Sequence, residues 1–264
     1  MSTATKGAQH ANLFNLRGQT AVIIGAGQGI GAAIAIGLAN AGADVVLGGR
    51  SAERLADTQR QASAAGITAS VAEVDVADPA SITRFAAAVL DRGPVPTILV
   101  NSAGGGGVRT AFDTTVEEWD TVHNIHLRGT FLACQAFGRA MATNGYGKII
   151  NMSSTWAATV GAGRSAYCAA KAGVGHLTAA LGVEWAPHGI RVNAMAPTAT
   201  LTPTIERRLA ADPARAEYLR KGIPLGRLAI PEDMVGAAVF LASPASDFVT
   251  GQTLFVDGGW QFAK

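Results

Sequence analysis

The sequence predicts an α/β fold, with a doubly wound parallel sheet of seven strands in a single domain. Short apolar runs alternate with longer runs rich in Ala, Leu, Arg and Glu. Such alternation of strands and helices is typical of a parallel sheet covered on both faces. Apolar residues make up 48% of the chain, glycine is abundant and aromatic residues are few. No Pro- or Ser-rich linker divides the 264 residues, so one domain is expected.

Strands and helices are told apart by the spacing of the apolar residues, which occur in short runs in the expected strands and in longer runs in the expected helices. Strands are expected at 20–24, 44–48, 67–74, 97–101, 148–152, 191–196 and 252–256. We expect residues 203–221 to form a helical lid over the substrate, because this Pro- and Arg-rich part interrupts the alternation. Residues 1–15 are expected to be a loose N-terminal arm, and residues 16–264 the folded domain.

Charge and composition argue against several classes of protein. The formal net charge is only +2 and no basic run is present, so nucleic acid is not indicated. No stretch approaches the roughly 20 apolar residues of a membrane helix, and the N-terminus lacks the apolar core of a signal peptide. Cys134 and Cys168 have neither metal nor disulfide spacing. We therefore expect a cytoplasmic protein without a metal and without a nucleic-acid or membrane partner.

A glycine-rich loop follows the first expected strand, where residues 25–31 read GAGQGIG and open a helix. Glycines let the backbone turn sharply and approach a pyrophosphate, whose charge then meets the N–H groups of the helix N-terminus. The spacing is G-x-x-x-G-x-G, not the more familiar G-x-G-x-x-G. A tight turn without a ligand is the alternative, but the place between strand and helix favours a Rossmann-type dinucleotide site.

The end of the second expected strand bears on which dinucleotide binds. An NAD enzyme usually places a carboxylate there to hold the ribose hydroxyls, but this chain has Gly49 followed by Arg50. A guanidinium can pair with the 2′-phosphate of NADP(H), which a carboxylate would repel. Arg50 could also be a merely solvated residue, and Gln28 is not basic and adds no support. The sequence favours NADP(H) over NAD(H).

A tyrosine and a lysine stand four residues apart, at Tyr167 and Lys171, on one face of an expected helix. A phenol with its ordinary pKa of roughly 10 is a poor acid–base group at neutral pH, and a neighbouring cation favours the phenolate. Such a pair also occurs by chance on surface helices. Ser154 follows the fifth expected strand and, by its spacing from Tyr167, is preferred over Ser153 as a partner.

Together these motifs resemble the short-chain dehydrogenase/reductase family, over about residues 16–256. The family loop T-G-x-x-x-G-I-G is matched from Gly25 onward, with Ile24 in place of the Thr. The family turn N-N-A-G is matched at 101–104, with Ser102 in place of one Asn. In general pattern the chain is similar to 3-oxoacyl-carrier-protein reductases and to sugar or polyol dehydrogenases.

This resemblance implies reversible hydride transfer between a nicotinamide cofactor and a small substrate, interconverting a ketone and a secondary alcohol. Ser154 would bind the substrate oxygen, Tyr167 would be the general acid/base, and Lys171 would hold the nicotinamide ribose and bias Tyr167. The implied cofactor contacts, besides Tyr167 and Lys171, are Gly25, Gln28, Gly29, Ile30, Gly31, Arg50, Asp75, Val76, Asn101, Ala103, Gly104, Pro197, Thr200 and Thr202. A catalytically silent, dinucleotide-binding regulatory protein is the alternative.

The chain departs from the family pattern at two positions. His126 stands where relatives carry an Asn whose main-chain carbonyl holds a water leading to the lysine. That carbonyl survives the change, so His126 is expected in the catalytic set, either as a titrating group or as a structural histidine. Thr198 replaces a glycine after Pro197, which leaves Thr200 and Thr202 as the expected contacts to the nicotinamide carboxamide.

Several residues are expected around the substrate. Residues 104–107 are all glycine and should border the active site with a mobile or closely approached backbone. Trp156 could form a pocket wall or pack in the core. Arg109 and Arg164 could meet an anionic substrate or only be solvated.

The family resemblance also implies a homotetramer. In relatives the two long helices, expected here near 115–143 and 165–187, and the last strand build it. Trp260 is expected either at a subunit interface or as cover for the sheet of its own chain.

Overall fold

The computed structural model describes residues 13–64, 66–105 and 108–263. They contain a seven-stranded sheet in the order β3-β2-β1-β4-β5-β6-β7, and every pair is parallel. The strands are β1 (Thr20–Ile24), β2 (Asp44–Gly49), β3 (Ala69–Glu73), β4 (Ile98–Asn101), β5 (Gly147–Met152), β6 (Ile190–Pro197) and β7 (Thr253–Val256). Each expected strand is confirmed, and the order reverses between β1 and β4. That reversal makes a doubly wound fold whose ligand crevice lies beyond the carboxyl ends of these strands.

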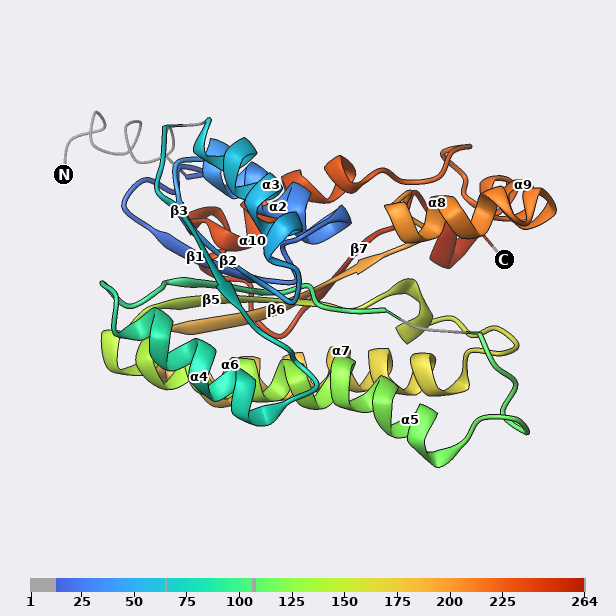
Figure 1. The fold of residues 1–264 in the computed structure, drawn as a ribbon, viewed down its shortest axis with the longest axis horizontal. Helices are drawn as coiled ribbons and strands as arrows, with labels where there is room; N and C mark the ends of the chain where they lie inside the picture. Colours follow the sequence, from blue (N-terminus) through green and yellow to red (C-terminus); the bar gives the residue numbers. More distant parts are fainter. Residues whose placement is uncertain (1–12, 65, 106–107, 264) are drawn as a thin grey trace.

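Helices cover both faces of the sheet (Figure 1). One face carries α2 (Gly29–Asn40), α3 (Ala52–Ser63) and α10 (Val235–Ala242), and the other carries α4 (Pro79–Leu90), α5 (Val116–His123), α6 (Gly129–Asn144) and α7 (Ser165–Trp185). Each face of the sheet forms a hydrophobic core with the helices that cover it. Successive residues of β1 belong to the two cores in turn, because side chains alternate across a strand. Ile23 packs in the cluster with Leu38 of α2, and Val22 packs in the cluster with Phe137 of α6. The strands are therefore apolar on both faces.

The long helix expected near 115–143 is interrupted. Residues Asn124–Arg128 form a π-helical segment between α5 and α6, in which the Gly129 N–H donates to the Asn124 carbonyl five residues back. Gly129 also faces Val76, where an added Cβ would lie 2.6 Å from the carbonyl oxygen. Single π-turns inside helices often occur at functional sites. This one contains His126.

The expected lid region, 203–221, is helical but forms two helices, α8 (Pro203–Ala210) and α9 (Pro213–Gly222). The break follows from Pro213, which cannot continue the preceding helix. The Asp212 side chain accepts the Arg215 N–H at 3.0 Å and starts α9 anew. Both helices lie at one end of the molecule, beyond the carboxyl ends of the strands (Figure 1). Their role as a lid stays a prediction.

Other expectations concern assembly and location. Residues 1–12 of the expected arm lie outside the described residues. Within the described ranges, no helix combines the length and the apolar character needed to cross a membrane. Phe131 of α6 is 38% exposed and Val183 of α7 is 77% exposed, on the two helices expected to build the tetramer. The homotetramer and the cytoplasmic location stay predictions.

Candidate active site

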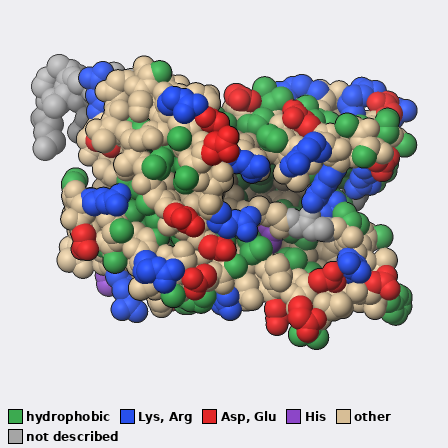
Figure 2. Space-filling view, viewed as in Figure 1, with side chains coloured by type: hydrophobic (Ala, Val, Ile, Leu, Met, Phe, Trp, Pro, Cys, Tyr) green, Lys and Arg blue, Asp and Glu red, His purple; other side chains and the backbone are tan. Residues whose placement is uncertain are grey.

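A cleft of about 1190 Å³ runs across the carboxyl ends of the strands. The molecule is hollowed there between the α8–α9 side and the glycine-loop side (Figure 2). The expected residues that line it are Gly25, Gln28, Gly29, Ile30, Gly31, Arg50, Asp75, Val76, Ala103, Gly104, His126, Ser154, Tyr167, Lys171, Pro197, Thr200 and Thr202. The fold thus brings together residues that are far apart in the sequence.

The glycine loop forms a cradle that side chains would fill. Gly25 has φ +93°, and a Cβ there would lie 2.5 Å from the Ala103 backbone nitrogen. A Cβ on Gly31 would lie 2.2 Å from the Gly25 carbonyl oxygen. Gln28, the residue before α2, makes no capping hydrogen bond with its side chain within the described chain, and the first residues of α2 line the cleft with their N–H groups uncapped by it. This geometry fits a pyrophosphate at a helix N-terminus.

Two arginines stand at the adenosine end of the cleft. Arg50 follows β2, and Arg54 lies one helical turn further along, on α3. The Ser51 side chain accepts the Arg54 N–H at 3.4 Å and caps α3. No carboxylate follows Gly49 at the end of β2, so the charges that line this end are cationic apart from Asp75. Sequence reasoning missed Arg54 and Ser51, although their helical spacing from Arg50 was a usable signal.

Asn101 is the one expected cofactor contact that does not line the cleft. Its side-chain amide donates to the side-chain oxygen Oδ1 of Asn151 at 2.9 Å and lies 3.3 Å from the Cys134 sulfur. The Asn151 amide in turn donates to the Thr178 hydroxyl at 3.0 Å. The Asn101 side chain is thus used in a buried network that ties β4 to β5 and α7, and the expected cofactor contact of Asn101 stays a prediction. The network forms because a buried amide must satisfy its hydrogen bonds internally.

Two hydrogen bonds lock α7 against the end of β5. The Ser153 hydroxyl donates to the Lys171 carbonyl at 3.0 Å, and the Lys171 ammonium donates to the Met152 carbonyl at 2.6 Å. The Ser154 hydroxyl is instead hydrogen-bonded to the Tyr167 side chain and lowers its pKa. The structure therefore supports the choice of Ser154 over Ser153.

Burial dominates the electrostatics of the tyrosine and the lysine. It raises the pKa of Tyr167, while the Ser154 hydroxyl and the Arg164 charge lower that pKa. Burial also lowers the pKa of Lys171 to about 7. The Lys171 ammonium lies 5.7 Å from the centroid of the Tyr167 ring. The charge of Arg164 therefore favours the phenolate, and the expected effect of Lys171 on Tyr167 stays a prediction.

His126 is 1% exposed and lies edge-on to the Tyr167 ring, with 5.1 Å between centroids. Its Nε2 is 2.6 Å from the Gly105 carbonyl oxygen, which can only accept, so Nε2 carries the proton. Nδ1 is then a buried acceptor that has no hydrogen-bond partner among the described residues. Burial, followed by the charge of Lys171, lowers the pKa of His126 to about 3. The imidazole is therefore neutral near pH 7, which disfavours the titrating alternative.

The main-chain carbonyl of His126 is the group expected to serve a water relay. It accepts the Thr130 hydroxyl at 2.7 Å. The relay expectation stays a prediction.

The comparisons with known proteins agree with this geometry. A family profile described as "Enoyl-(Acyl carrier protein) reductase" matches residues 25–261, nearly the whole chain. The chain belongs to the short-chain dehydrogenase/reductase family. It is therefore an oxidoreductase, and the resemblance found in its motifs is confirmed.

Several members of this family are similar to the chain over almost its full length. Gluconate 5-dehydrogenase of Gluconobacter oxydans is 40% identical over 95% of this chain and 97% of its own. D-threitol dehydrogenase of Mycolicibacterium smegmatis is 42% identical over 94% of each chain. The crystal structure of a gluconate 5-dehydrogenase from Burkholderia cenocepacia in complex with NADP and tartrate has a TM-score of 0.90 and 37% identity, covering 95% of this chain and 98% of that one.

Two tryptophans complete the walls of the short-chain dehydrogenase/reductase cleft. Trp156 lines it and lies under the Arg164 guanidinium. Trp260 is 4% exposed, lines the same cleft and stacks edge-on with Tyr218 of α9. The side chain of Trp260 is therefore buried within its own chain, which favours the second of the two expected places for it. Of the four expected loop glycines, 106 and 107 lie outside the described residues.

Substitution of Gly31 by alanine tests whether the glycine loop binds the dinucleotide. We expect Gly31→Ala to lower dinucleotide affinity by about 100-fold or more, because the clash with the Gly25 carbonyl must displace the loop. NADPH binding is measured by isothermal titration calorimetry. The melting temperature of each protein is recorded as a check that it is folded.

Gly236→Ala is the matched control, because an added Cβ there meets nothing within 4 Å and lies in α10. It should bind NADPH like the wild type. Equal binding by folded Gly31→Ala would show that the loop is not the pyrophosphate site.

Proposed function

We propose that the chain is an NADP(H)-dependent oxidoreductase that interconverts a ketone and a secondary alcohol of a small polyhydroxylated substrate. The observation that carries this proposal is the placement of Ser154, Tyr167 and Lys171 in the same cleft as the glycine cradle. The dehydrogenases named above act on polyhydroxylated compounds, one an acid and one a neutral polyol, which supports this substrate class.

The proposed roles follow from the contacts of each side chain. The Ser154 hydroxyl holds the substrate oxygen, and the Tyr167 hydroxyl gives its proton to that oxygen in reduction or takes it back in oxidation. The bound dinucleotide supplies or accepts the hydride at the neighbouring carbon. Because burial keeps the pKa of Tyr167 high, the phenol is protonated near neutral pH and ready to act as the acid. Lys171, whose ammonium donates to the Met152 carbonyl, would hold the nicotinamide ribose of the bound cofactor.

We expect Tyr167→Phe to lower kcat by about 1000-fold, the scale of a lost general acid/base. NADPH binding should stay within about twofold of the wild type, since the ring and its packing against His126 remain. The measurement is steady-state NADPH oxidation over a panel of ketoses and keto acids, with NADPH titration of the same preparations. A Tyr167→Phe protein that keeps its turnover would contradict the role. A wild type that binds NADPH and turns over no substrate would support the silent regulatory protein instead.

We propose that His126 is a neutral positioning residue in this reaction. Its Nε2–H holds the Gly105 carbonyl at the rim of the site, and its Nδ1 offers a buried acceptor beside Tyr167 and Lys171. We expect His126→Asn, the residue of relatives, to lower kcat/KM by about tenfold through loss of one hydrogen bond. Because the pKa of His126 is about 3, the wild type and the variant should have kcat–pH profiles of the same shape between pH 5 and 9. A limb near pH 6 that only the wild type shows would mean that His126 titrates.

The preference for NADP(H) is proposed on the arginines at the end of β2. We expect Arg50→Ala to weaken NADPH binding about 10- to 100-fold, the worth of charge-assisted hydrogen bonds to a phosphate, and to leave NADH nearly unchanged. Arg92→Ala, an exposed arginine outside the cleft, is the control. Equal loss of NADPH and NADH binding, or a wild type that prefers NADH, would overturn the preference.

A further inference from the structure

A side pocket of about 540 Å³ opens beside Tyr167. It shares Gly105, Arg164, Tyr167 and Arg208 with the larger cleft, so the two spaces are continuous. Its volume lies within the roughly 300–1,000 Å³ that sites for small molecules occupy. The part of a substrate that extends away from its reacting carbon would therefore enter this pocket.

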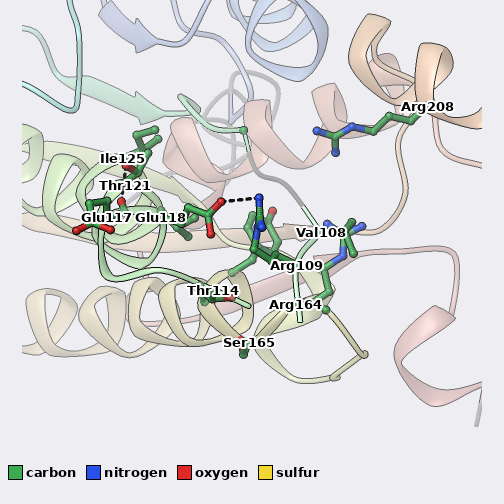
Figure 3. Close-up of a pocket in the computed structure, with 15 residues that line it drawn as sticks. Val108, Arg109, Thr114, Glu117, Glu118, Thr121, Ile125, Arg164, Ser165 and Arg208 are labelled. Carbon is green, nitrogen blue, oxygen red and sulfur yellow. Dashed lines mark hydrogen bonds and ion pairs between the residues drawn. The ribbon is translucent and has the colours of Figure 1, made fainter. Parts of the chain in front are cut away.

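Charged side chains of both signs line the side pocket. Among the described residues, the cations are Arg109, Arg164 and Arg208, and the anions are Glu117 and Glu118 of α5. Glu118 pairs with Arg109 at 2.9 Å (Figure 3). Arg208 of α8 has an interaction partner of its own. With Arg109 paired and Arg208 engaged, one charge of each sign remains, on Arg164 and on Glu117.

These two remaining charges lie on opposite sides of the pocket (Figure 3). Arg164 is half-buried at the start of α7, and its guanidinium lies over the Trp156 ring, 5.9 Å from the centroid. Glu117 lies in the first turn of α5, where hydrogen bonds from its own N–H and from the Thr115 side chain lower its pKa. Glu117 is therefore ionised near neutral pH, and an anion in the pocket would be attracted to one wall and repelled by the other.

The charges of the larger cleft next to Arg164 are mixed as well. Burial lowers the pKa of Arg164, the charges of Arg208 and Arg215 lower it further, and the Tyr167 phenol opposes them. Asp212 contributes a carboxylate to the wall of the larger cleft, and its Oδ1 accepts the backbone N–H of Arg215 at 3.0 Å. The surroundings of Arg164 therefore contain counter-charges that belong to the chain itself.

Two hydroxyl groups in the pocket wall are left as hydrogen-bond acceptors. The Thr114 hydroxyl donates to the Thr110 carbonyl at 2.8 Å, and the Thr121 hydroxyl donates to the Glu117 carbonyl at 2.7 Å. Each hydroxyl has a single proton, so both oxygens can only accept from a ligand. A carboxylate is itself an acceptor only and cannot bond to this wall, whereas an alcohol hydroxyl donates one hydrogen bond and accepts another.

We infer that the substrate is a neutral polyol, whose chain extends into the side pocket so that its hydroxyls donate to the α5 wall and accept from Arg164. This inference rests on the proposed function and narrows its substrate class from polyhydroxylated compounds in general to uncharged ones. An acid would bring its carboxylate next to Glu117 and Glu118, and such like charges discriminate against a ligand. A zwitterion also carries one charge of each sign, so the test includes one.

The test compares neutral polyols with acids of the same carbon skeleton. The pairs are glycerol and D-glycerate, D-threitol and D-threonate, and D-glucitol and D-gluconate, oxidised with NADP⁺ and with NAD⁺. In the wild type, kcat/KM for the best polyol should exceed that of its acid by at least about tenfold, because the acid places like charges side by side. L-Threonine, a hydroxy amino acid, is the zwitterion arm.

Two isosteric substitutions then assign the preference to the α5 wall. Glu117→Gln and Glu118→Gln should each lower the polyol-to-acid ratio of kcat/KM about two- to fivefold, the scale of interactions between exposed charges. The double variant should bring the ratio close to one. Glutamine at position 118 can keep the capping box with Thr115, so α5 should stay folded, which the melting temperature checks.

Asp120→Asn is the matched control. Asp120 is an exposed carboxylate of the same helix, and it lines neither the side pocket nor the larger cleft. Its loss changes the charge of α5 by the same amount as either glutamate substitution. The polyol-to-acid ratio of this variant should stay at the wild-type value, which separates contact in the pocket from the general charge of the helix.

Each outcome decides between the two levels of the proposal. A wild type that prefers the acids or L-threonine overturns the neutral polyol while the oxidoreductase function stands. A ratio that the double variant leaves unchanged, or that Asp120→Asn lowers equally, overturns it too. Absence of turnover with all of these compounds, both cofactors and the ketone panel overturns the proposed function and this inference together.

Discussion

The site depends on the two hydrogen bonds that join the end of β5 to α7. Ser153 reaches the carbonyl of Lys171, and Lys171 reaches the carbonyl of Met152, so strand and helix hold each other in register. Ser154 and Tyr167 lie on either side of this joint, and their mutual orientation follows from it. Because both bonds are buried, their loss would leave polar groups without water or protein partners, which makes the arrangement costly to deform.

Arginine side chains lie at both ends of the cleft, and the ionisable residues at its centre are buried. Arg50 and Arg54 stand at the adenosine end, and Arg164 and Arg208 stand at the end that opens into the side pocket. Between them, burial raises the pKa of Tyr167 and lowers that of Lys171, so this centre is poorly solvated. The positive charge of Arg50 and Arg54 suits the phosphorylated cofactor that is proposed above.

The strands, the glycine loop and the catalytic pair could be predicted from the sequence, because the patterns that indicate them are local. The strands were found to within two residues because their apolar runs are short, and each is bounded by polar or glycine-rich turns. The glycine loop and the Tyr167–Lys171 pair were found because their function requires a fixed spacing along one turn or one helix face. Arg54 was missed although it lies one helical turn from Arg50, and the π-segment that carries His126 gave no compositional signal at all.

The sequence by itself determined the fold class, the positions of the strands along the chain and the residue types that carry the chemistry, since periodicity and spacing act within a few residues. Only the tertiary structure decided which of those side chains face the cleft and in what charge state. The Asn101 side chain turned inward to Asn151, His126 became a neutral imidazole, and Arg164 came close enough to lower the pKa of Tyr167. These outcomes depend on burial and on neighbours brought from distant parts of the chain, and no local pattern contains that information.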